Sequence, residues 1–557
     1  MKKMNIQTFI KKHSKAWRGI KYVGLPILIY FVLFTVLTWP WLPHFGTHFF
    51  TDGGDGYQNV WNMWWVERSV TELHRLPWYT QYLHFPFGVT LIGQTLNPFN
   101  GFVALGLLPF MHLNQAFNIM VIFSFVMGGL TAFWLCYYFA KAYVPSLIGG
   151  VIFTFSSYHF AHAQGHMQLV SLEWIPLFIL LWWKFLTKPS YWLAAGSAVS
   201  LTLVLLCDYY YFLYSLIFAA MAILWFWHTK KLPDLKKATT LKPLGLLAGL
   251  GLLLVAPLPL ALLRANSHTE FLGSHSARLF STDIATPLLN GGFWKFHSLT
   301  DWYYKYLPAN IFEATVYVTL ATFTLIVISL VKRKKLPKEL LFWQILIIFF
   351  GVMSLGPRLM VRGNTIEHAP MPYVIMERVV PGMKLSGMPV RMMVMVLLGS
   401  AVIAAMVLAR LDLSKRKSKL IMSAFVLVLL VEIWPKPLPL TPANYSNYVA
   451  RLKTLPSTGG VLDEAAKDPY TQLFNQTLHE KPMPFGYISR QPKELGEKEL
   501  PIIEYNTQNK LNLLCSEFKI RYVTAPAAKP RNTTFPIIYQ DNQAIIYDLK
   551  GSPNSNC

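Results

Sequence analysis

The sequence has little charge for its length. Of its 557 residues only 14% are Asp, Glu, Lys or Arg, whereas 54% are hydrophobic and the mean hydropathy is +0.37. A water-soluble protein carries about 25% charged residues, so the composition excludes an ordinary soluble globular protein. Acidic residues are the scarcer kind, with 27 against 50 basic ones.

Cysteine is also scarce. The chain has four cysteines and no C-x-x-C pair, which argues against a zinc knuckle and against a disulfide framework. A single bridge between Cys515 and Cys557 stays open.

Long apolar runs take the place of charge. They recur in blocks of about 20 residues, the length that crosses a bilayer as a helix. We therefore predict an all-α polytopic membrane protein with about eleven transmembrane helices. The predicted spans are 22–42, 116–140, 146–160, 168–187, 191–207, 208–228, 243–263, 311–331, 340–356, 389–409 and 419–435.

The distribution of basic residues supports this count and gives an orientation. If the N-terminus is inside, lysine and arginine cluster in the inner loops, for example 229–242, 332–338 and 410–419. The positive-inside rule requires this alternation. We expect a multi-pass protein of the inner (plasma) membrane with a cytoplasmic N-terminus. Anionic lipids then account for the net charge of +23, and no nucleic-acid partner is needed.

The composition changes near residue 436. Four prolines between 435 and 442 predict a stiff exit from the membrane. Beyond them, the segments 460–463, 520–523 and 544–547 look like short buried strands between polar turns. We therefore divide the chain into three parts. They are a basic cytoplasmic N-terminus (1–21), a transmembrane part (22–435) with first outer loop 43–115, and a small extracytoplasmic α/β domain (436–557).

A short acidic cluster, Asp52-Gly53-Gly54-Asp55, follows the first span on the outer side. Trp61, Trp64 and Trp65 come next at helical spacing, which predicts a helix lying along the membrane interface, where tryptophan is enriched. Two carboxylates at a membrane cavity suit a catalytic base or a metal ligand. The alternative is a plain turn, because Asp and Gly are ordinary turn residues.

A second polar cluster joins the third and fourth spans on the outer side. His162 and His166 are four residues apart, so a helix would place both on one face. Glu173 follows in a membrane segment, where ionisable groups are usually functional. The imidazoles suit a divalent metal or phosphate oxygens. Interfacial histidines that only satisfy local backbone groups are the alternative.

Two arginines and an aspartate complete the candidate binding residues. Arg358 lies at the start of the outer loop 357–388, and Arg391 begins the span that follows this loop. A guanidinium fork donates to two phosphate oxygens at once. Snorkelling toward lipid headgroups is the alternative. Asp208, beside three tyrosines at the outer junction of two spans, suits a sugar or metal contact, and an interfacial aromatic belt is an equal alternative.

Taken in order, these features resemble the GT-C superfamily of membrane glycosyltransferases, and most closely a poorly characterised prokaryotic branch. GT-C enzymes use polyprenyl-phosphate sugars. The motifs that carry the resemblance are Asp52-x-x-Asp55 with Trp61-x-x-Trp64-Trp65, His162-x-x-x-His166 with Glu173-Trp174-x-Pro176-Leu177, Leu355-Gly356-Pro357 with Pro389-Val390-Arg391, and Gly486-Tyr487-Ile488-Ser489-Arg490.

The resemblance implies a hexosyltransferase that moves a sugar from a polyprenyl-phosphate donor to an extracytoplasmic glycan, lipid or protein, with Asp55 or Asp52 as the catalytic base. A divalent metal, magnesium or manganese, stays open. Its ligands would be Asp52, Asp55 and His166. We assign substrate binding to His162, His166, Glu173, Asp208, Arg358 and Arg391.

Two alternatives remain for the function. A lipid-linked sugar flippase needs ionisable residues in mid-span and usually repeat symmetry, of which the sequence shows little. A non-catalytic GT-C-like scaffold explains the C-terminal part, but not the clustered aspartates and histidines.

Overall fold

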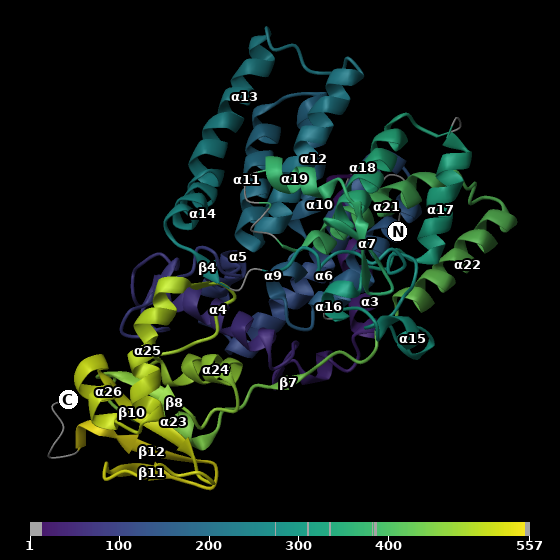
Figure 1. Ribbon diagram of the computed structural model, residues 1–557. Helices are drawn as coiled ribbons and strands as arrows, with labels where there is room; N and C mark the ends of the chain where they lie inside the picture. Colours follow the sequence, from purple (N-terminus) through teal and green to yellow (C-terminus); the bar gives the residue numbers. More distant parts are fainter. Residues whose placement is uncertain are drawn as a thin grey trace, which may run out of the picture.

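The fold is known from a computed structural model of the chain. It describes residues 14–551 except 273–274, 309–310, 334–335, 381–382 and 384–386. Most of the predicted N-terminal part falls outside the described residues, as does Cys557, so the bridge between Cys515 and Cys557 stays open. Helices make up most of the described chain, and a smaller mixed segment lies at one end of them (Figure 1).

Six helical stretches are long and apolar enough to cross a membrane. They are Trp17–Leu37, Leu113–Ala140, Met167–Thr187, Tyr209–His228, Ala238–Val255 and Pro389–Leu408. Shorter apolar helices cover Pro98–Leu107, Tyr191–Cys207, Leu320–Val331 and Glu339–Ser354. The chain is therefore a multi-pass membrane protein, whereas the number of eleven spans stays a prediction.

Several predicted spans are broken by polar residues that cap helices. The predicted span 146–160 divides into α7 (Tyr143–Thr154) and α8 (Ser157–His162). The predicted span 311–331 divides into α16 (Ile311–Ala314) and α17 (Leu320–Val331), whose N-cap Thr319 accepts a hydrogen bond from a backbone N–H of its first turn. Such caps satisfy backbone donors that the helix cannot satisfy itself.

Asp208 caps a helix in the same way. It separates α11 (Tyr191–Cys207) from α12 (Tyr209–His228), as the sequence predicts. Its Oδ1 accepts hydrogen bonds from the backbone N–H groups of Tyr210 and Tyr211 at 2.8 and 3.1 Å. The carboxylate therefore starts α12 and places three tyrosines in its first turn.

Helix α21 (Met393–Leu408) lies at the centre of the bundle, and all of its residues are buried. Small residues allow neighbours to approach closely, as is usual between membrane helices. A Cβ atom at Gly399 would lie 2.6 Å from Ile347 Cγ2 of α18 (Glu339–Ser354). The helices around α21 are α6 (Leu113–Ala140), α7, α17 and α18. Helices α13 (Ala238–Leu250), α14 (Pro257–His268) and α22 (Arg416–Ile433) lie at the sides of the bundle (Figure 1), and α3 (Leu25–Leu37) packs against α6.

The C-terminal segment contains a four-stranded mixed sheet in the order β11-β12-β10-β8. Strand β8 is parallel to β10, and the other pairs are antiparallel. The three predicted strands are present as β8 (Gly460–Asp463), β10 (Ile520–Pro526) and β12 (Ala544–Asp548), and β11 (Ile537–Gln540) forms an edge. The helices beside the sheet are α23 (Asn447–Thr454), α24 (Pro469–His479), α25 (Lys493–Thr507) and α26 (Leu511–Phe518). A separate extracytoplasmic domain stays a prediction.

Short strand pairs tie this segment to the loops of the helical part. Strand β7 (Thr441–Pro442) pairs with β1 (His48–Phe49), and β9 (Gln491–Pro492) pairs with β4 (Phe271–Leu272). Helix α24 also packs against α4 (Asp55–Thr71) of the first outer loop. The first outer loop and the C-terminal segment therefore form one folded unit (Figure 1).

The predicted tryptophan helix is present as α4, but its tryptophans do not lie at a membrane interface. Trp61, Trp64 and Trp65 are 1%, 6% and 0% exposed. The Trp61 indole N–H donates to Gln476 Oε1 of α24 at 2.6 Å. The prediction that these tryptophans lie at the membrane interface is therefore wrong, because the C-terminal segment packs on the aromatic face of α4.

Candidate functional site

A cleft opens between the first outer loop, α11, α12, α14 and residues 487–490 of the C-terminal segment. Its walls enclose about 1370 Å³, part of which is open to solvent. One wall is charged, and the other is apolar. The acidic and basic lining residues are Asp55, His166, Asp208, His275, Glu313, Arg391 and Arg490. The apolar wall contains Leu205 and Leu206 of α11, Leu213 of α12, and Leu258, Leu262 and Leu263 of α14.

Asp55 is the first residue of α4 and faces the cleft. Its Oδ2 lies 3.0 Å from His166 Nε2, and the Tyr470 hydroxyl of α24 also hydrogen-bonds the carboxylate. Burial raises the pKa of Asp55, but these hydrogen bonds and the positive charges of His166 and Arg391 outweigh it and lower the pKa. The side chain is 34% exposed, so an ionised carboxylate remains accessible to a ligand.

Asp52 has a different environment. Its Oδ1 accepts hydrogen bonds from the backbone N–H groups of Gly54 and Gly56 at 3.0 and 2.9 Å. A Cβ atom at Gly56 would lie 2.3 Å from Thr51 Oγ1, so the turn requires glycine there. Burial raises the pKa of Asp52 in spite of these hydrogen bonds. Asp52 thus shapes the turn and does not line the cleft.

The lowered pKa of Asp55 predicts a pH-dependent contribution to stability. A carboxyl group with a lower pKa in the folded state stabilises the fold above its unfolded-state pKa, and this contribution is lost as the pH falls through the folded-state pKa. We expect Asp55→Asn to lower the unfolding temperature of the detergent-solubilised protein at neutral pH. The difference from wild type should vanish in acid, below the ordinary titration range of aspartate. A difference that is equal at every pH would contradict this, and Asp234→Asn in an exposed loop is the control.

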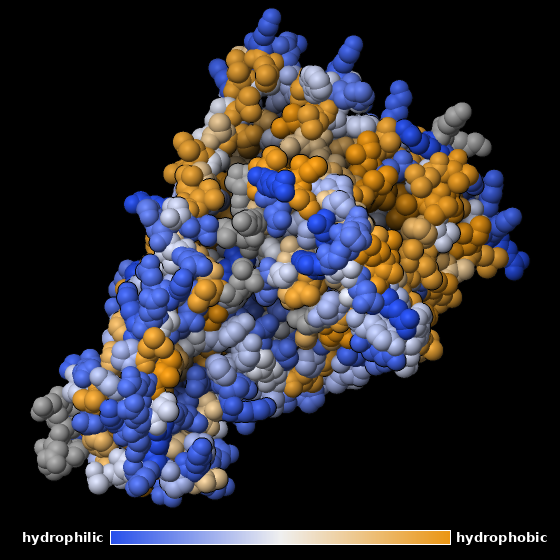
Figure 2. All heavy atoms as spheres, in the orientation of Figure 1, coloured by the Kyte–Doolittle hydropathy of each residue, from blue (hydrophilic) through white to orange (hydrophobic). Residues whose placement is uncertain are grey.

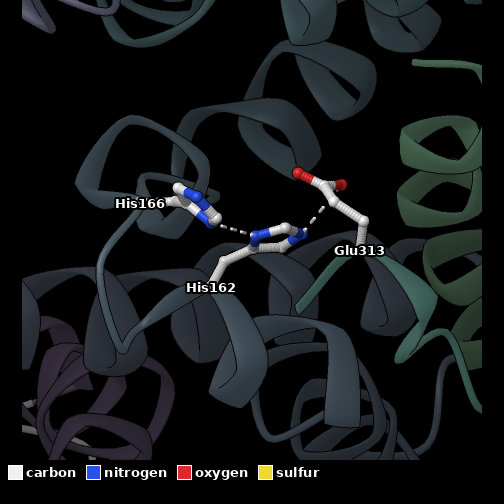
Figure 3. Close-up of side chains that lie close together, drawn as sticks. All are labelled: His162, His166 and Glu313. Atoms are coloured by element: carbon white, nitrogen blue, oxygen red, sulfur yellow. Dashed lines mark hydrogen bonds and ion pairs between the residues drawn. The ribbon is translucent and has the colours of Figure 1, made fainter. Parts of the chain in front are cut away.

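His162, His166 and Glu313 lie close together (Figure 3), and His166 joins this group to Asp55. His162 Nδ1 is 3.1 Å from His166 Nδ1, so one of these two nitrogens carries the hydrogen. His162 Nε2 is 3.9 Å from Glu313 Oε2. One ligand atom of each residue lies within 4.8 Å of the others, so this group could hold a metal ion.

Glu313 also binds Arg391. The Arg391 Nη2 donates to Glu313 Oε1 at 2.5 Å, and Nε donates to both carboxylate oxygens at 3.1 and 3.2 Å. Both side chains are buried, 6% and 2% exposed. The guanidinium also lies over the Tyr210 ring, 4.7 Å from its centroid. The contacts with Glu313 use Nε and Nη2, whereas Nη1 is not among them.

Sequence reasoning missed Glu313 and Arg490. Glu313 is a lone acidic residue at the outer end of the predicted span 311–331. Ionisable residues in membrane segments are usually functional, so its position indicated a site residue. Arg490 belongs to the quoted segment Gly486 to Arg490, but no local pattern indicates that this segment reaches the cleft. Its Nη2 donates to the Tyr210 hydroxyl at 3.3 Å.

The predicted residues fall into three groups. Asp55, His166, Asp208 and Arg391 line the cleft, and His162 lies directly behind His166. Glu173 is buried elsewhere and accepts a hydrogen bond from Ser124 Oγ at 2.9 Å. Arg358 is half-buried in β5 (Arg358–Val361), which pairs with β6 (Asn364–Pro370). Asp52, Glu173 and Arg358 are not among the described residues of the cleft wall, and their roles stay predictions.

Gln94 of the first outer loop holds the C-terminal segment at the cleft. Its Nε2 donates to the Arg490 carbonyl at 2.5 Å. Its Oε1 accepts hydrogen bonds from Ser489 Oγ and the Arg490 N–H at 2.9 and 3.2 Å. The Gln94 side chain is buried, so water can replace these hydrogen-bond partners only if the surrounding side chains move. Gln94 therefore holds the backbone of Arg490 at the cleft.

Removal of this side chain should loosen the segment locally. In Gln94→Ala, the partners lose hydrogen bonds worth about 1–3 kcal/mol when buried. We expect amide hydrogen exchange of residues 486–490 to become about tenfold faster or more. Gln508→Ala is the matched control, because its side chain bonds only to Glu504 at the surface. Unchanged exchange in Gln94→Ala would show that other contacts hold the segment.

Solved structures with a similar fold are membrane glycosyltransferases. The cryo-EM structure of arabinofuranosyltransferase AftD from Mycobacteria matches 96% of the chain with a TM-score of 0.57 at 12% identity. A mutant of AftD matches 96% with a TM-score of 0.54 at 12% identity. The chain has the GT-C fold. This confirms the predicted resemblance at the level of the fold.

The similarity covers only part of AftD. The chain spans 40% of the AftD chain, or 42% of the mutant chain. ArnT from Cupriavidus metallidurans bound to undecaprenyl phosphate matches 95% of the chain and 98% of its own, at 11% identity. Its TM-score of 0.46 is too low to support an argument. No protein-family model and no curated protein matches the sequence.

Proposed function

We propose that the protein is a GT-C-type glycosyltransferase that moves a sugar from a polyprenyl-phosphate donor to an acceptor outside the cytoplasm. The observation that carries the proposal is a single cleft with three kinds of group. It combines an accessible carboxylate on Asp55, guanidinium groups on Arg391 and Arg490, and a wall of leucines. These suit an acceptor hydroxyl, a phosphate and a prenyl chain, respectively.

The apolar wall supports a lipid-linked donor. Helix α13 buries only Thr240 and Pro243, and α14 buries no residue at all. Leu258 and Leu262 of α14 still reach the cleft. A prenyl chain in the membrane can therefore follow α14 to the charged wall without leaving an apolar environment, which its hydrocarbon requires.

In the proposed reaction, the acceptor hydroxyl oxygen attacks the anomeric carbon of the sugar while the bond to the phosphate oxygen breaks. Asp55 takes the hydroxyl proton as general base. Arg391 and Arg490 stabilise the negative charge on the departing lipid phosphate. His166 orients the Asp55 carboxylate through its 3.0 Å contact. Attack on the face opposite the phosphate inverts the anomeric configuration.

A divalent metal fits the same region. His162, His166 and Glu313 offer imidazole nitrogens and a carboxylate, a donor set that suits manganese better than magnesium. Among the described residues, the buried His162 Nε2 has no hydrogen-bond partner, as expected for an atom that can accept a metal. A bound metal would help to offset phosphate charge. The sequence assigns His166, Asp55 and Asp52 to a metal. His166 belongs to this group, and Asp55 is hydrogen-bonded to His166. The Asp52 carboxylate instead accepts hydrogen bonds from the backbone of its own turn.

Metal binding can be measured without activity. Manganese bound to the purified protein loses the electron paramagnetic resonance signal of the free hydrated ion. We expect the wild-type chain to remove about one equivalent of this signal and His166→Ala to remove none, because imidazole is a preferred ligand. His368→Ala, which changes an exposed histidine in β6, should behave as wild type. Equal binding by all three proteins would exclude His166 as a ligand.

The function is tested by a transfer assay in liposomes with polyprenyl-phosphate hexoses and a mixture of envelope glycan acceptors. A transferase forms a new glycosidic bond. A flippase instead moves labelled lipid between leaflets without forming that bond, and a scaffold does neither.

We also propose that the N-terminus is cytoplasmic and that residues 436–557 form an extracytoplasmic α/β domain of the inner (plasma) membrane protein, which follows from the distribution of basic loops.

A further inference from the structure

A second cleft lies at the other end of α12. The first turn of α12 lines the candidate site, whereas its last turn and the residues after it line this second cleft together with α17 and α18. Helix α12 has 20 residues, a length of about 30 Å, which is also the thickness of the hydrocarbon core. The two clefts therefore lie near opposite membrane surfaces.

The wall of the second cleft is apolar. It is formed by Met221, Leu224 and Trp225 of α12 and by Phe342 and Ile345 of α18. The Trp225 and Phe342 rings are 5.8 Å apart, so the two helices touch through aromatic side chains at its floor. The space between the walls is about 2850 Å³. This is ample for an acyl chain.

The rim of the same cleft is cationic. Lys231, Lys332, Arg333 and Lys338 line it and are exposed. Among the described residues of the cleft, Glu339 is the single carboxylate, 3.6 Å from Lys231. An adjoining hollow shares Lys231, Trp225, Pro337 and Glu339 and adds Lys141. Positive charge thus exceeds negative charge at the rim.

The cleft also opens sideways. Leu224 is 60% exposed and Leu330 is 53% exposed. In Figure 2, hydrophobic residues cover the sides of the upper helices, and hydrophilic residues gather at their tips. A cationic rim above an apolar wall that faces hydrocarbon matches a lipid with a negative headgroup. A soluble acidic peptide would match the rim alone.

We propose that this cleft binds an anionic phospholipid of the membrane. The phosphate lies against the cations of the rim, and an acyl chain lies along Leu224, Trp225 and Ile345. Lysine and arginine at a membrane surface attract anionic lipid strongly enough to select it over a zwitterionic one. This site is separate from the proposed transfer site and independent of that function.

Native mass spectrometry of the full chain in detergent tests the proposal, with phosphatidylglycerol as the probe and phosphatidylcholine as its neutral counterpart. We expect wild type to retain phosphatidylglycerol preferentially. The combined variant Lys231→Gln, Lys332→Gln, Arg333→Gln and Lys338→Gln should bind it at least about tenfold more weakly. The matched control, Lys415→Gln, Arg416→Gln, Lys417→Gln and Lys419→Gln, removes the same charge from another predicted inner loop and should bind as wild type.

A second variant tests the apolar wall with the rim intact. Leu224→Trp fills the cleft and should also weaken retention of phosphatidylglycerol by about tenfold, since an acyl chain contributes about 0.8 kcal/mol per buried CH₂. Millimolar inorganic phosphate should not displace the lipid. Two outcomes would overturn the proposal. Equal losses of binding in the two charge variants would show that the lipid is held by positive charge anywhere on this surface. Displacement of the lipid by phosphate would show that the cleft binds an anion and not an acyl chain.

Discussion

Asp55→Asn should reduce sugar transfer by about 10²–10⁴-fold, the range that a positioned general base contributes. Asparagine has nearly the same shape as aspartate, and its carbonyl oxygen can keep the contact with His166. It carries no negative charge and cannot take the acceptor proton. The measurement is the initial rate of transfer in liposomes at saturating donor, with folding checked by the unfolding temperature at the same pH.

Asp52→Asn is the matched control for this prediction. Its Oδ1 can still accept the hydrogen bonds from Gly54 and Gly56, so the turn should persist. Transfer should therefore stay within about tenfold of wild type, since the change leaves the proposed base in place. If Asp52→Asn lost as much activity as Asp55→Asn, the assignment of the base to the cleft-facing residue would be wrong.

Arg391→Met should destabilise the protein by about 3–5 kcal/mol, because it leaves the Glu313 carboxylate buried without its cation. The pair is almost inaccessible to solvent, and Arg391 makes three hydrogen bonds to Glu313. Methionine fills a similar volume, so the lost charge is the main change. Transfer should also fall, since Arg391 is proposed to bind the donor phosphate. The measurements are thermal unfolding in detergent and donor binding.

The double variant Glu313→Gln with Arg391→Met separates these two effects. Removal of both charges should recover most of the lost stability, because no uncompensated charge remains. Donor binding should stay impaired, since the guanidinium is still missing. Recovery of both properties would show that Arg391 acts only on the fold. No recovery of stability would show that the pair is not the source of the loss.

Much of the fold follows from local sequence patterns. The three strands β8, β10 and β12 were predicted from short apolar runs between polar turns, and their pairing partners lie within the same segment. The break at Asp208 is predicted from the meeting of two apolar blocks there, and the structure adds that the carboxylate caps α12. These features depend on a few neighbouring residues, which the sequence shows directly.

The misses share one cause, which is contact between residues far apart in sequence. The tryptophans of α4 have the pattern of an interfacial helix, but residues later in the same loop and residues of the C-terminal segment, such as Leu83 and Gln476, bury them. Arg490 reaches the cleft because Gln94 binds its backbone. Glu313 lies at the cleft paired with Arg391, which is 78 positions away in the sequence. Local patterns contain no information on such partners.

The pairing of β1 with β7 joins the first outer loop to a segment that is made much later. The ribosome makes Asp55 several hundred residues before Tyr470, its hydrogen-bond partner, and before Arg490, which lines the same cleft, so this cleft is complete only after the C-terminal segment has been made. The proposed transfer activity therefore requires the C-terminal segment and should be absent from a chain that has not yet reached it.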